Sequence, residues 1–367
     1  MLPPSFPEQN RADGGAGSRM IVTLSGDARA LPLPPSTVDL VVTSPPYWRT
    51  RDYGFATQIG QEASPEEYVE TLVAALREWR RVLRPTGSVF LNIGDTYHSH
   101  SLAGIPGLLE VRARQERWYI RNRIIWAKRF GLPSPAKNRL VSRHEYIYHL
   151  TTGTDYYYDL QGYAEYSGRT ANPGDVWHIK FAPSKKDHLA PFPRELVERG
   201  IILACPEAVC RKCGQPRRRI VKRTMELDER RPQAKRAMEI AKQAGLTEDH
   251  IAAVQATGIS DAGKAMKIQN GTGRNAKQVQ KLAAEAKRVL GGYFREFTFA
   301  KKVTVGFTDC GCQAGFSPGA VLDPFCGSGT TLEVAEAMNR IGIGVDLRPE
   351  TSGRYRRSKP TTPVAQA

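Results

Sequence analysis

Short apolar runs and amphipathic stretches alternate along the chain, and this pattern predicts strands and helices in turn. Apolar runs at residues 20–24, 38–42 and 88–93 have the length and composition of strands. Between the second and third runs, residues 64–67 (SPEE) combine a capping serine, a proline at the first helical position and a glutamate at the third, which predicts a helix start. Apolar side chains then recur at helical spacing, at Tyr68, Leu72, Leu76, Trp79 and Leu83, before residues 84–87 (RPTG) end the helix.

The same alternation continues later in the chain. Residues 144–150 predict a further strand, and residues 321–322 predict another that leads into a glycine-rich turn. A helix at residues 331–340 and a strand at 341–345 complete the pattern. We therefore predict an α/β fold with helices on both faces of a mostly parallel sheet, in which ligands bind beyond the carboxyl ends of the strands.

One segment interrupts the α/β pattern. Residues 206–305 are rich in Lys, Arg and Ala with helical periodicity, and two cysteine pairs flank their basic part. We interpret this segment as an insertion into an α/β domain formed by residues 19–205 and 306–351. Residues 1–18 are expected to be a disordered leader, and residues 352–367 a polar tail.

Charge adds a candidate partner to this picture. The chain of 367 residues has 53 Lys and Arg against 37 Asp and Glu, which gives a formal charge of +16, and a charge of this size attracts polyanions such as nucleic acid. The sequence has no run of about 18 apolar residues and no apolar signal core at its amino terminus, so we expect a cytoplasmic protein without a membrane segment. Disulfides are then not expected, and the six cysteines are core thiols, metal ligands or reactive groups.

A first candidate site follows the strand at residues 38–42, where residues 43–48 read TSPPYW. The two prolines remove backbone donors and leave carbonyl oxygens that can accept hydrogen bonds from a ligand. Ser44 adds a hydroxyl, and Tyr47 and Trp48 add flat faces, which together suit a planar group with an exocyclic amine, such as a nucleobase. A proline-rich turn with core aromatics is the alternative, and the hexapeptide alone does not decide between them.

A second candidate site lies at residues 323–331 (DPFCGSGTT), directly after a strand and at the start of a helix. Its glycines allow a tight turn and a close approach of the backbone to a cofactor. The motif has no Gly-Lys-Ser/Thr ending, which excludes a P-loop, and Leu332 replaces the third glycine of the dinucleotide fingerprint. Asp346 ends the next strand, where an acidic residue binds ribose hydroxyls in nucleotide-binding α/β folds, so an adenosine-containing cofactor is predicted. The alternative is a structural glycine turn with Asp346 as a cap.

The two motifs together resemble motifs IV and I of the S-adenosylmethionine-dependent DNA amino-methyltransferases. Because the catalytic motif precedes the cofactor motif, the chain resembles the circularly permuted beta group of that family. The resemblance covers about residues 20–205 and 318–350. It implies a Rossmann-like class I methyltransferase sheet that starts at its third strand and finishes with its first two, so that residues 19–205 and 306–351 would form the catalytic and cofactor-binding domain.

The resemblance also implies a binding site for S-adenosylmethionine. Gly26-Asp27 resembles the motif whose acid meets the adenine, Asp346 matches the ribose-binding acid, and residues 188–193 (HLAPFP) resemble the motif that completes the pocket. The loop on the methionine side is matched within the second motif, whose cofactor-binding candidates are Asp323, Phe325, Gly327, Gly329 and Thr330.

The resemblance further implies direct methyl transfer to the amine of a base flipped out of double-stranded DNA. Ser44 and the Pro45 carbonyl would accept hydrogen bonds from the amine, Pro46 would stiffen the corner, and Tyr47 would stack on the base. No covalent nucleophile is needed, so Cys326 is interpreted as an inert residue of the cofactor loop.

Two polar residues lie near this site in the sequence. Asn92 and Asp95 follow the neighbouring strand and could help to hold the target base, whereas Asp95 could equally be only a loop cap.

The serine form of the first motif favours N4 of cytosine as the methyl acceptor, with N6 of adenine as the alternative. A catalytically silent DNA-binding regulatory protein is the alternative of another class. A cognate restriction endonuclease is a candidate partner.

The insertion contributes a candidate metal site and a candidate DNA-binding surface. Cys210 and Cys213 form a zinc-type knuckle, and Cys310 and Cys312, at a tighter spacing than usual, could complete four thiolate ligands. A structural zinc ion is favoured over reduced core thiols, with Cys205 left out. The cations between the two pairs are expected to contact DNA phosphates, although a solvated helix face is the alternative.

Overall fold

The computed structural model describes residues 20–128, 137–168, 172, 174–180, 193–228, 231–258, 277–298 and 300–347. The expected leader, the expected tail and nearly all of the motif at residues 188–193 lie outside these residues. The chain forms two compact units, each described by itself below. The first, here called the α/β unit, comprises Met1–Tyr163, Asn172–Arg218 and Asp309–Ala367, and the second, the helical unit, comprises Ala164–Ala171 and Arg219–Thr308.

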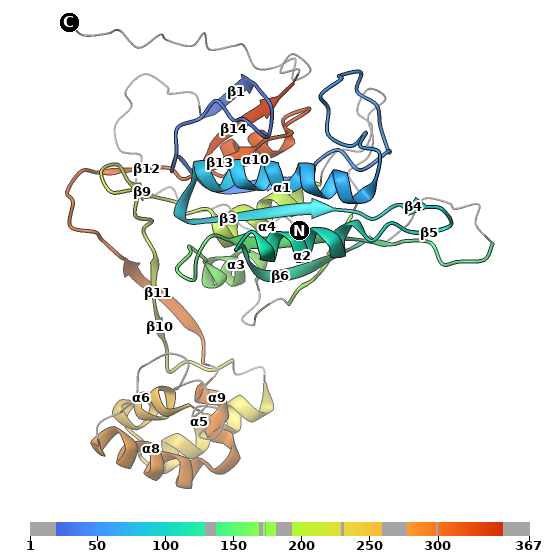
Figure 1. The fold of residues 1–367 in the computed structure, drawn as a ribbon. Helices are drawn as coiled ribbons and strands as arrows, with labels where there is room; N and C mark the ends of the chain where they lie inside the picture. Colours follow the sequence, from blue (N-terminus) through green and yellow to red (C-terminus); the bar gives the residue numbers. More distant parts are fainter. Residues whose placement is uncertain are drawn as a thin grey trace, which may run out of the picture. The chain divides into compact units, whose positions relative to one another are not determined.

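An eight-stranded sheet forms the centre of the α/β unit (Figure 1). The order across the sheet is β1 (Ile21–Ser25), β14 (Ile341–Asp346), β13 (Ala320–Asp323), β2 (Val38–Thr43), β3 (Leu83–Ile93), β7 (His144–Thr151), β6 (Tyr119–Lys128) and β8 (Val176–Ile179). The first five strands are parallel, and β7 is antiparallel to both of its neighbours. The predicted α/β fold is confirmed, and β1 lies at the edge beside the last two strands of the chain, as the permuted order implies.

Helices cover both faces of this sheet. Along β2, Val41 belongs to one apolar cluster while Leu40 and Val42 belong to another, because successive side chains of a strand point to opposite faces. Helices α1 (Pro65–Val82) and α2 (Ile105–Gln115) pack in the first cluster. Helices α4 (Arg194–Ala204) and α10 (Thr330–Ala337) pack in the second, and α3 (Leu160–Ser167) contributes residues to both units.

The predicted boundaries hold to within one residue, with two larger differences. Helix α1 starts as expected, with Ser64 as the cap whose hydroxyl accepts a hydrogen bond from the Glu67 amide at 3.2 Å. Strand β3 begins at Leu83, earlier than predicted, because Leu83 already pairs with Val38 of β2. Helix α10 ends at Ala337, three residues before the predicted end.

Two short strand pairs extend from the α/β unit. Strands β4 (Tyr97–His98) and β5 (Ser101–Leu102) form a hairpin, and β9 (Val209–Cys210) pairs antiparallel with β12 (Phe316–Ser317).

The helical unit has its own apolar core. Its antiparallel strands are β10 (Arg219–Arg223) and β11 (Lys302–Phe307), and its helices are α5 (Pro232–Gln243), α6 (Glu248–Thr257), α8 (Lys277–Leu290), η1 (Gly291–Tyr293) and α9 (Phe294–Thr298). Alanines of α5 and α8 pack with larger side chains such as Ile251, Leu290 and Phe297. In the described residues, no helix has both the length and the apolar character that crossing a membrane requires.

Candidate active site

The hexapeptide at residues 43–48 forms the corner that directly follows β2. The Pro46 carbonyl accepts a hydrogen bond from the Tyr68 hydroxyl of α1 at 2.8 Å, which fixes the corner against that helix. The Pro45 carbonyl accepts no hydrogen bond from the described part of the chain. The two prolines therefore differ, because one carbonyl is held by the protein and the other remains an acceptor.

A hydrogen-bond network holds the side chains of this corner. The Tyr47 hydroxyl donates to Glu145 Oε2 at 2.6 Å, and Ser44 Oγ lies 3.4 Å from the same hydroxyl. Asn92 Nδ2 donates to Tyr47 Oη at 2.8 Å, to Glu145 Oε2 at 2.8 Å and to Ser44 Oγ at 3.3 Å. The Tyr47 ring lies against Gly94, where a Cβ atom would come within 2.9 Å of the ring. Asn92 is thus part of the hydrogen-bond network of the corner.

Glu145 and Lys128 are the residues of this network that sequence reasoning missed. They come from the antiparallel strands β7 and β6, and their side chains form an ion pair that is only 15% and 14% exposed. The carboxylate uses Oε1 for Lys128 and Oε2 for Tyr47 and Asn92. Burial and the charge of Glu145 raise the pKa of Tyr47 well above its usual value, so the phenol stays protonated and can donate. Only the register between β6 and β7 could have indicated this pair.

Trp48 and Asp95 serve the fold. Trp48 is 1% exposed and its Nε1 donates to the Glu62 carbonyl at 2.9 Å, so the expectation that its ring offers a face to a base is wrong. The Asp95 carboxylate accepts hydrogen bonds from the amides of Gly104 and Ile105 at 3.1 and 3.2 Å, at the start of α2. Asp95 is therefore a loop cap, the second of its two interpretations.

Asp323 links the two motifs. It ends β13, the strand beside β2, and its Oδ1 accepts hydrogen bonds from Thr43 Oγ1 at 2.6 Å and from the Phe325 amide at 3.1 Å. Its Oδ2 accepts one from Thr331 Oγ1 at 2.7 Å. Burial raises the pKa of Asp323 to about 6, because desolvation outweighs these hydrogen bonds. Two motifs that are 280 residues apart in the chain are therefore joined by one buried hydrogen bond.

The remaining acidic candidates lie at the carboxyl ends of β1 and β14. Asp346 Oδ2 accepts the Gly327 amide at 2.9 Å, and the Asp346 carbonyl accepts the Gly26 amide at 3.1 Å. Asp27 follows Gly26 and forms an ion pair with Arg29 at 2.6 Å, which lowers the pKa of Asp27. The structure thus brings the glycine loop, Asp346 and Asp27 to one edge of the sheet.

The glycine loop leaves room for a ligand. Gly327 has φ +46°, and a Cβ atom there would meet nothing closer than the Phe325 carbonyl at 3.9 Å. Gly329, with φ +84°, caps α10, whose first residue is Thr330. The Phe325 ring lies edge-on to Trp79, with centroids 6.1 Å apart. Positive φ angles and open space at Gly327 allow a ligand to approach the backbone closely.

Cys326 lies within this loop but is buried, and its Sγ sits where a side chain on Gly344 would collide with it. Burial raises the pKa of the thiol far above its usual value, so it remains protonated. This agrees with its interpretation as an inert residue.

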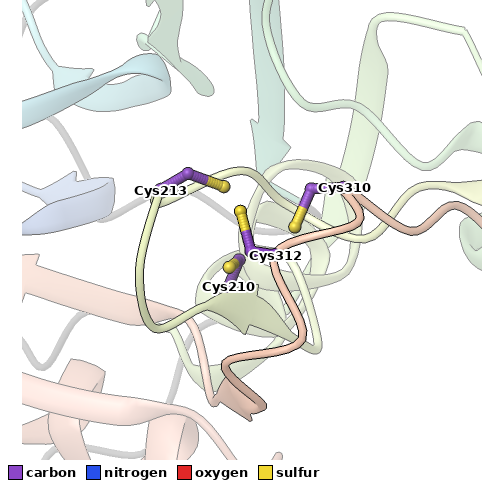
Figure 2. A group of neighbouring side chains, drawn as sticks. All are labelled: Cys210, Cys213, Cys310 and Cys312. Atoms are coloured by element: carbon purple, nitrogen blue, oxygen red, sulfur yellow. The ribbon is translucent and has the colours of Figure 1, made fainter.

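The four cysteines of the predicted metal site come together within the α/β unit (Figure 2). The Sγ atoms of Cys210, Cys213, Cys310 and Cys312 all lie within 4.8 Å of one another. Cys205 is buried and stands apart from this group.

Comparisons with known proteins concern the two motifs after β2 and β13. A family model for N6/N4 methyltransferases, described as DNA methylase, matches residues 38–208 and 316–352. The type II methyltransferase M.Cfr9I of Citrobacter freundii is 35% identical over 203 residues, which cover 47% of this chain and 67% of that protein. M.SmaI of Serratia marcescens is 34% identical over 206 residues, covering 47% and 70%.

The fold also matches a solved structure. The PvuII DNA methyltransferase, described as cytosine-N4-specific, superposes with a TM-score of 0.52 at 16% identity, covering 93% of this chain and 90% of that one. At this identity the likeness concerns the fold alone. The family match includes both the corner after β2 and the glycine loop after β13, and the chain therefore belongs to the DNA methylase family of S-adenosylmethionine-dependent N6/N4 amino-methyltransferases.

Proposed function

We propose that this chain methylates the N4 amine of cytosine in double-stranded DNA. The observation that supports this most directly is the hydrogen bond between Thr43 and Asp323, which joins the start of the acceptor corner to the start of the cofactor loop. Direct transfer between two bound groups requires that their sites be held together, and a buried bond between adjacent strand ends does this.

The residues at the strand ends fit S-adenosylmethionine. The open backbone at Gly327, next to the turn at Gly329, would take the methionine part, while Asp346 and Asp27 offer carboxylates to the ribose and the adenine. Since Asp323 is buried and both of its oxygens are bonded within the protein, its part would be to shape the loop. When bound, the cofactor supplies a methyl group activated by a sulfonium.

The corner after β2 would prepare the amine. An exocyclic amine is a weak nucleophile because its lone pair is conjugated with the ring. Hydrogen bonds from its two protons to Ser44 Oγ and to the Pro45 carbonyl would turn the nitrogen toward tetrahedral geometry and free the lone pair for attack on the methyl carbon. Pro45 fits this role better than Pro46, whose carbonyl already accepts a hydrogen bond from Tyr68. The Tyr47 ring, fixed through its hydroxyl, would stack on the flipped base.

The serine at position 44, directly before the two prolines of the corner, supports cytosine over adenine as the proposed base. Incubation with labelled S-adenosylmethionine and unmethylated duplex DNA, followed by nucleoside analysis, tests this proposal. We expect N4-methylcytosine. N6-methyladenine would establish the alternative base, and cofactor binding without methyl transfer would favour a silent DNA-binding protein.

Helix α8 offers a surface for the DNA backbone. Lys277, Lys281 and Arg288 are exposed, and their spacing puts them on one side of the helix, while Ala283, Ala286 and Leu290 face the core. We call these three cations the α8 stripe. Elsewhere in the helical unit several cations are already paired, as Arg231 is with Glu296. We propose that the stripe contacts phosphates and contributes affinity without reading bases.

A restriction endonuclease with the same recognition sequence is the proposed partner in the cell, as the type II names of the relatives suggest for those proteins. Plasmid DNA from cells that express the chain should resist such an endonuclease, once methylation mapping has identified the sequence. Cleavage at fully methylated sites would contradict this partnership.

A further inference from the structure

We propose that Cys210, Cys213, Cys310 and Cys312 bind one zinc ion as four thiolates, and that this ion joins the two ends of the insertion to the strand that carries the cofactor loop. The proposal does not depend on which base is methylated. The family match stops at residue 208 and resumes at 316, so all four cysteines lie in the part of the chain that this match leaves out.

The spacing of the sulfur atoms fits one ion. A zinc–sulfur distance of about 2.3 Å in tetrahedral geometry puts the thiolates about 3.8 Å apart. The four Sγ atoms are already within 4.8 Å of one another, and side-chain rotations alone could close the remaining difference. Figure 2 shows the four side chains converging from two separate loops.

The backbone of each loop is shaped for this convergence. In the first pair, the Gly214 amide donates to the Cys210 carbonyl at 3.0 Å, and Gly214 has φ +71°. In the second, the Gly311 amide donates to Asp309 Oδ1 at 2.7 Å, and Gly311 has φ +73°. These turns reverse the chain next to the cysteines, so that both thiols of a pair can face one point.

The two loops are connected through the backbone as well. Cys210 pairs with Phe316 where β9 meets β12, and the Arg211 amide donates to the Gly315 carbonyl at 3.1 Å. The metal ligands therefore sit on a preformed scaffold. Such a scaffold favours metal binding, because less chain entropy is lost when the ion binds.

Other uses of four adjacent cysteines fit less well. An iron–sulfur cluster places several iron and sulfide atoms between its cysteines, which keeps them further apart than a single ion does. Four thiolates at this separation would repel one another, and a divalent cation between them compensates their charge. The cations of Arg211 and Lys212, next to Cys210, would offset the remaining negative charge of a four-thiolate zinc site.

The ion would hold the start of the cofactor strand. After Cys312 the chain passes through β12 at Phe316–Ser317 and enters β13 at Ala320, which ends at Asp323. On the other side, Cys213 lies at the first end of the insertion and Cys310 at the second. A metal bond between them closes this long loop of chain at its base, which limits the motion of both ends.

Metal analysis of the full chain tests the proposal. After purification with a reductant and dialysis against metal-free buffer, we expect about one zinc per chain. Cys213→Ser and Cys310→Ser, both at exposed positions, should each reduce the zinc content at least fivefold, whereas Cys205→Ala, next to the site in sequence but outside the cluster, should keep it. Folded, reduced protein without zinc, or ligand variants with the wild-type zinc content, would overturn the proposal.

A second measurement does not depend on the variants folding. Cobalt exchanged into the wild-type chain should show strong sulfur-to-metal absorption and the visible bands of a tetrahedral site. A mercurial reagent should release the ion as four thiols react. The weak spectrum of an octahedral cobalt site, or iron with sulfide in the purified protein, would contradict a four-thiolate zinc site. Binding of S-adenosylmethionine, measured on the same samples, reports the methyltransferase proposal separately.

Discussion

Glu145→Gln tests whether the network behind the corner prepares it for catalysis. Glu145 uses one carboxylate oxygen for Lys128 and the other for Tyr47 and Asn92. Glutamine has the same shape but only one acceptor oxygen. Either the NH2 group of the glutamine then faces Lys128, or it faces the Tyr47 and Asn92 donors. In the first arrangement Lys128 loses its charged partner, and in the second the Tyr47 hydroxyl and the Asn92 amide lose their acceptor, so either one disturbs the network that fixes the corner.

The size of the effect follows from burial. A buried donor without a partner costs about 1–3 kcal/mol. If the unpaired donor displaces the side chains of the corner, the rate of methyl transfer falls about 5- to 150-fold, since about 1.4 kcal/mol corresponds to a factor of ten. Within the described part of the chain, Glu145 bonds to Tyr47, Asn92 and Lys128, and none of these belongs to the glycine loop, so the Kd for S-adenosylmethionine should change less than about threefold.

Single-turnover transfer of a labelled methyl group to unmethylated plasmid DNA measures this rate, and calorimetry measures cofactor binding. Glu70→Gln is the matched control, because Glu70 forms an ion pair with Arg112 on the surface, where such pairs contribute little. A Glu145→Gln rate within twofold of the wild type would refute the positioning role. Equal losses of rate and cofactor affinity would indicate damage to the whole unit instead.

Three further predictions follow from other contacts. Thr43→Val removes the donor to Asp323 and should lower the free energy of unfolding by about 1–3 kcal/mol at pH 8. The loss should be smaller at pH 5, because Asp323, with a pKa of about 6, is then mostly protonated. Urea unfolding that shows the same loss at both pH values would contradict this. Burial lowers the pKa of His149 to about 3, so its contribution to stability is complete above pH 6.5 and is lost as the pH falls toward 3. The free energy of unfolding should therefore fall by about 2 kcal/mol between pH 7.5 and 5. His149→Asn should flatten this part of the stability–pH curve, and parallel curves for the two proteins would contradict the prediction. Replacing the three cations of the α8 stripe by glutamines should reduce the slope of log K for DNA against log salt concentration by about 2–3. Exchanging its lysines and arginine for each other should keep the slope. An unchanged slope in the glutamine variant would show that the stripe does not contact DNA.

The sequence was sufficient for the parts of the site that lie within single motifs. Strand ends next to Pro-Pro and to Gly-x-Gly could be predicted because local apolar runs and turn residues determine them. A metal site formed by Cys210, Cys213, Cys310 and Cys312 could be predicted, because closely spaced cysteine pairs are typical of zinc ligands. Trp48 was misjudged, since a motif does not tell which of two adjacent aromatic side chains turns into the core.

The rest depends on contacts between distant segments. Glu145 reaches Tyr47 only through the register of β7 against β3 and β6, and a shift of one residue would turn its side chain to the other face of the sheet. No local pattern around Glu145 or Lys128 marks either residue as part of a site. The difference between the Pro45 and Pro46 carbonyls likewise depends on Tyr68, which comes from a helix that begins after the motif.

The most direct test of the central claim is the identity of the methylated nucleoside. DNA treated with the full chain and labelled S-adenosylmethionine should, after digestion, carry its label as N4-methylcytosine, and Ser44→Ala should reduce that label strongly while cofactor binding persists. Label in 5-methylcytosine would contradict direct transfer to an exocyclic amine, because methylation at carbon requires a covalent nucleophile that this site does not use.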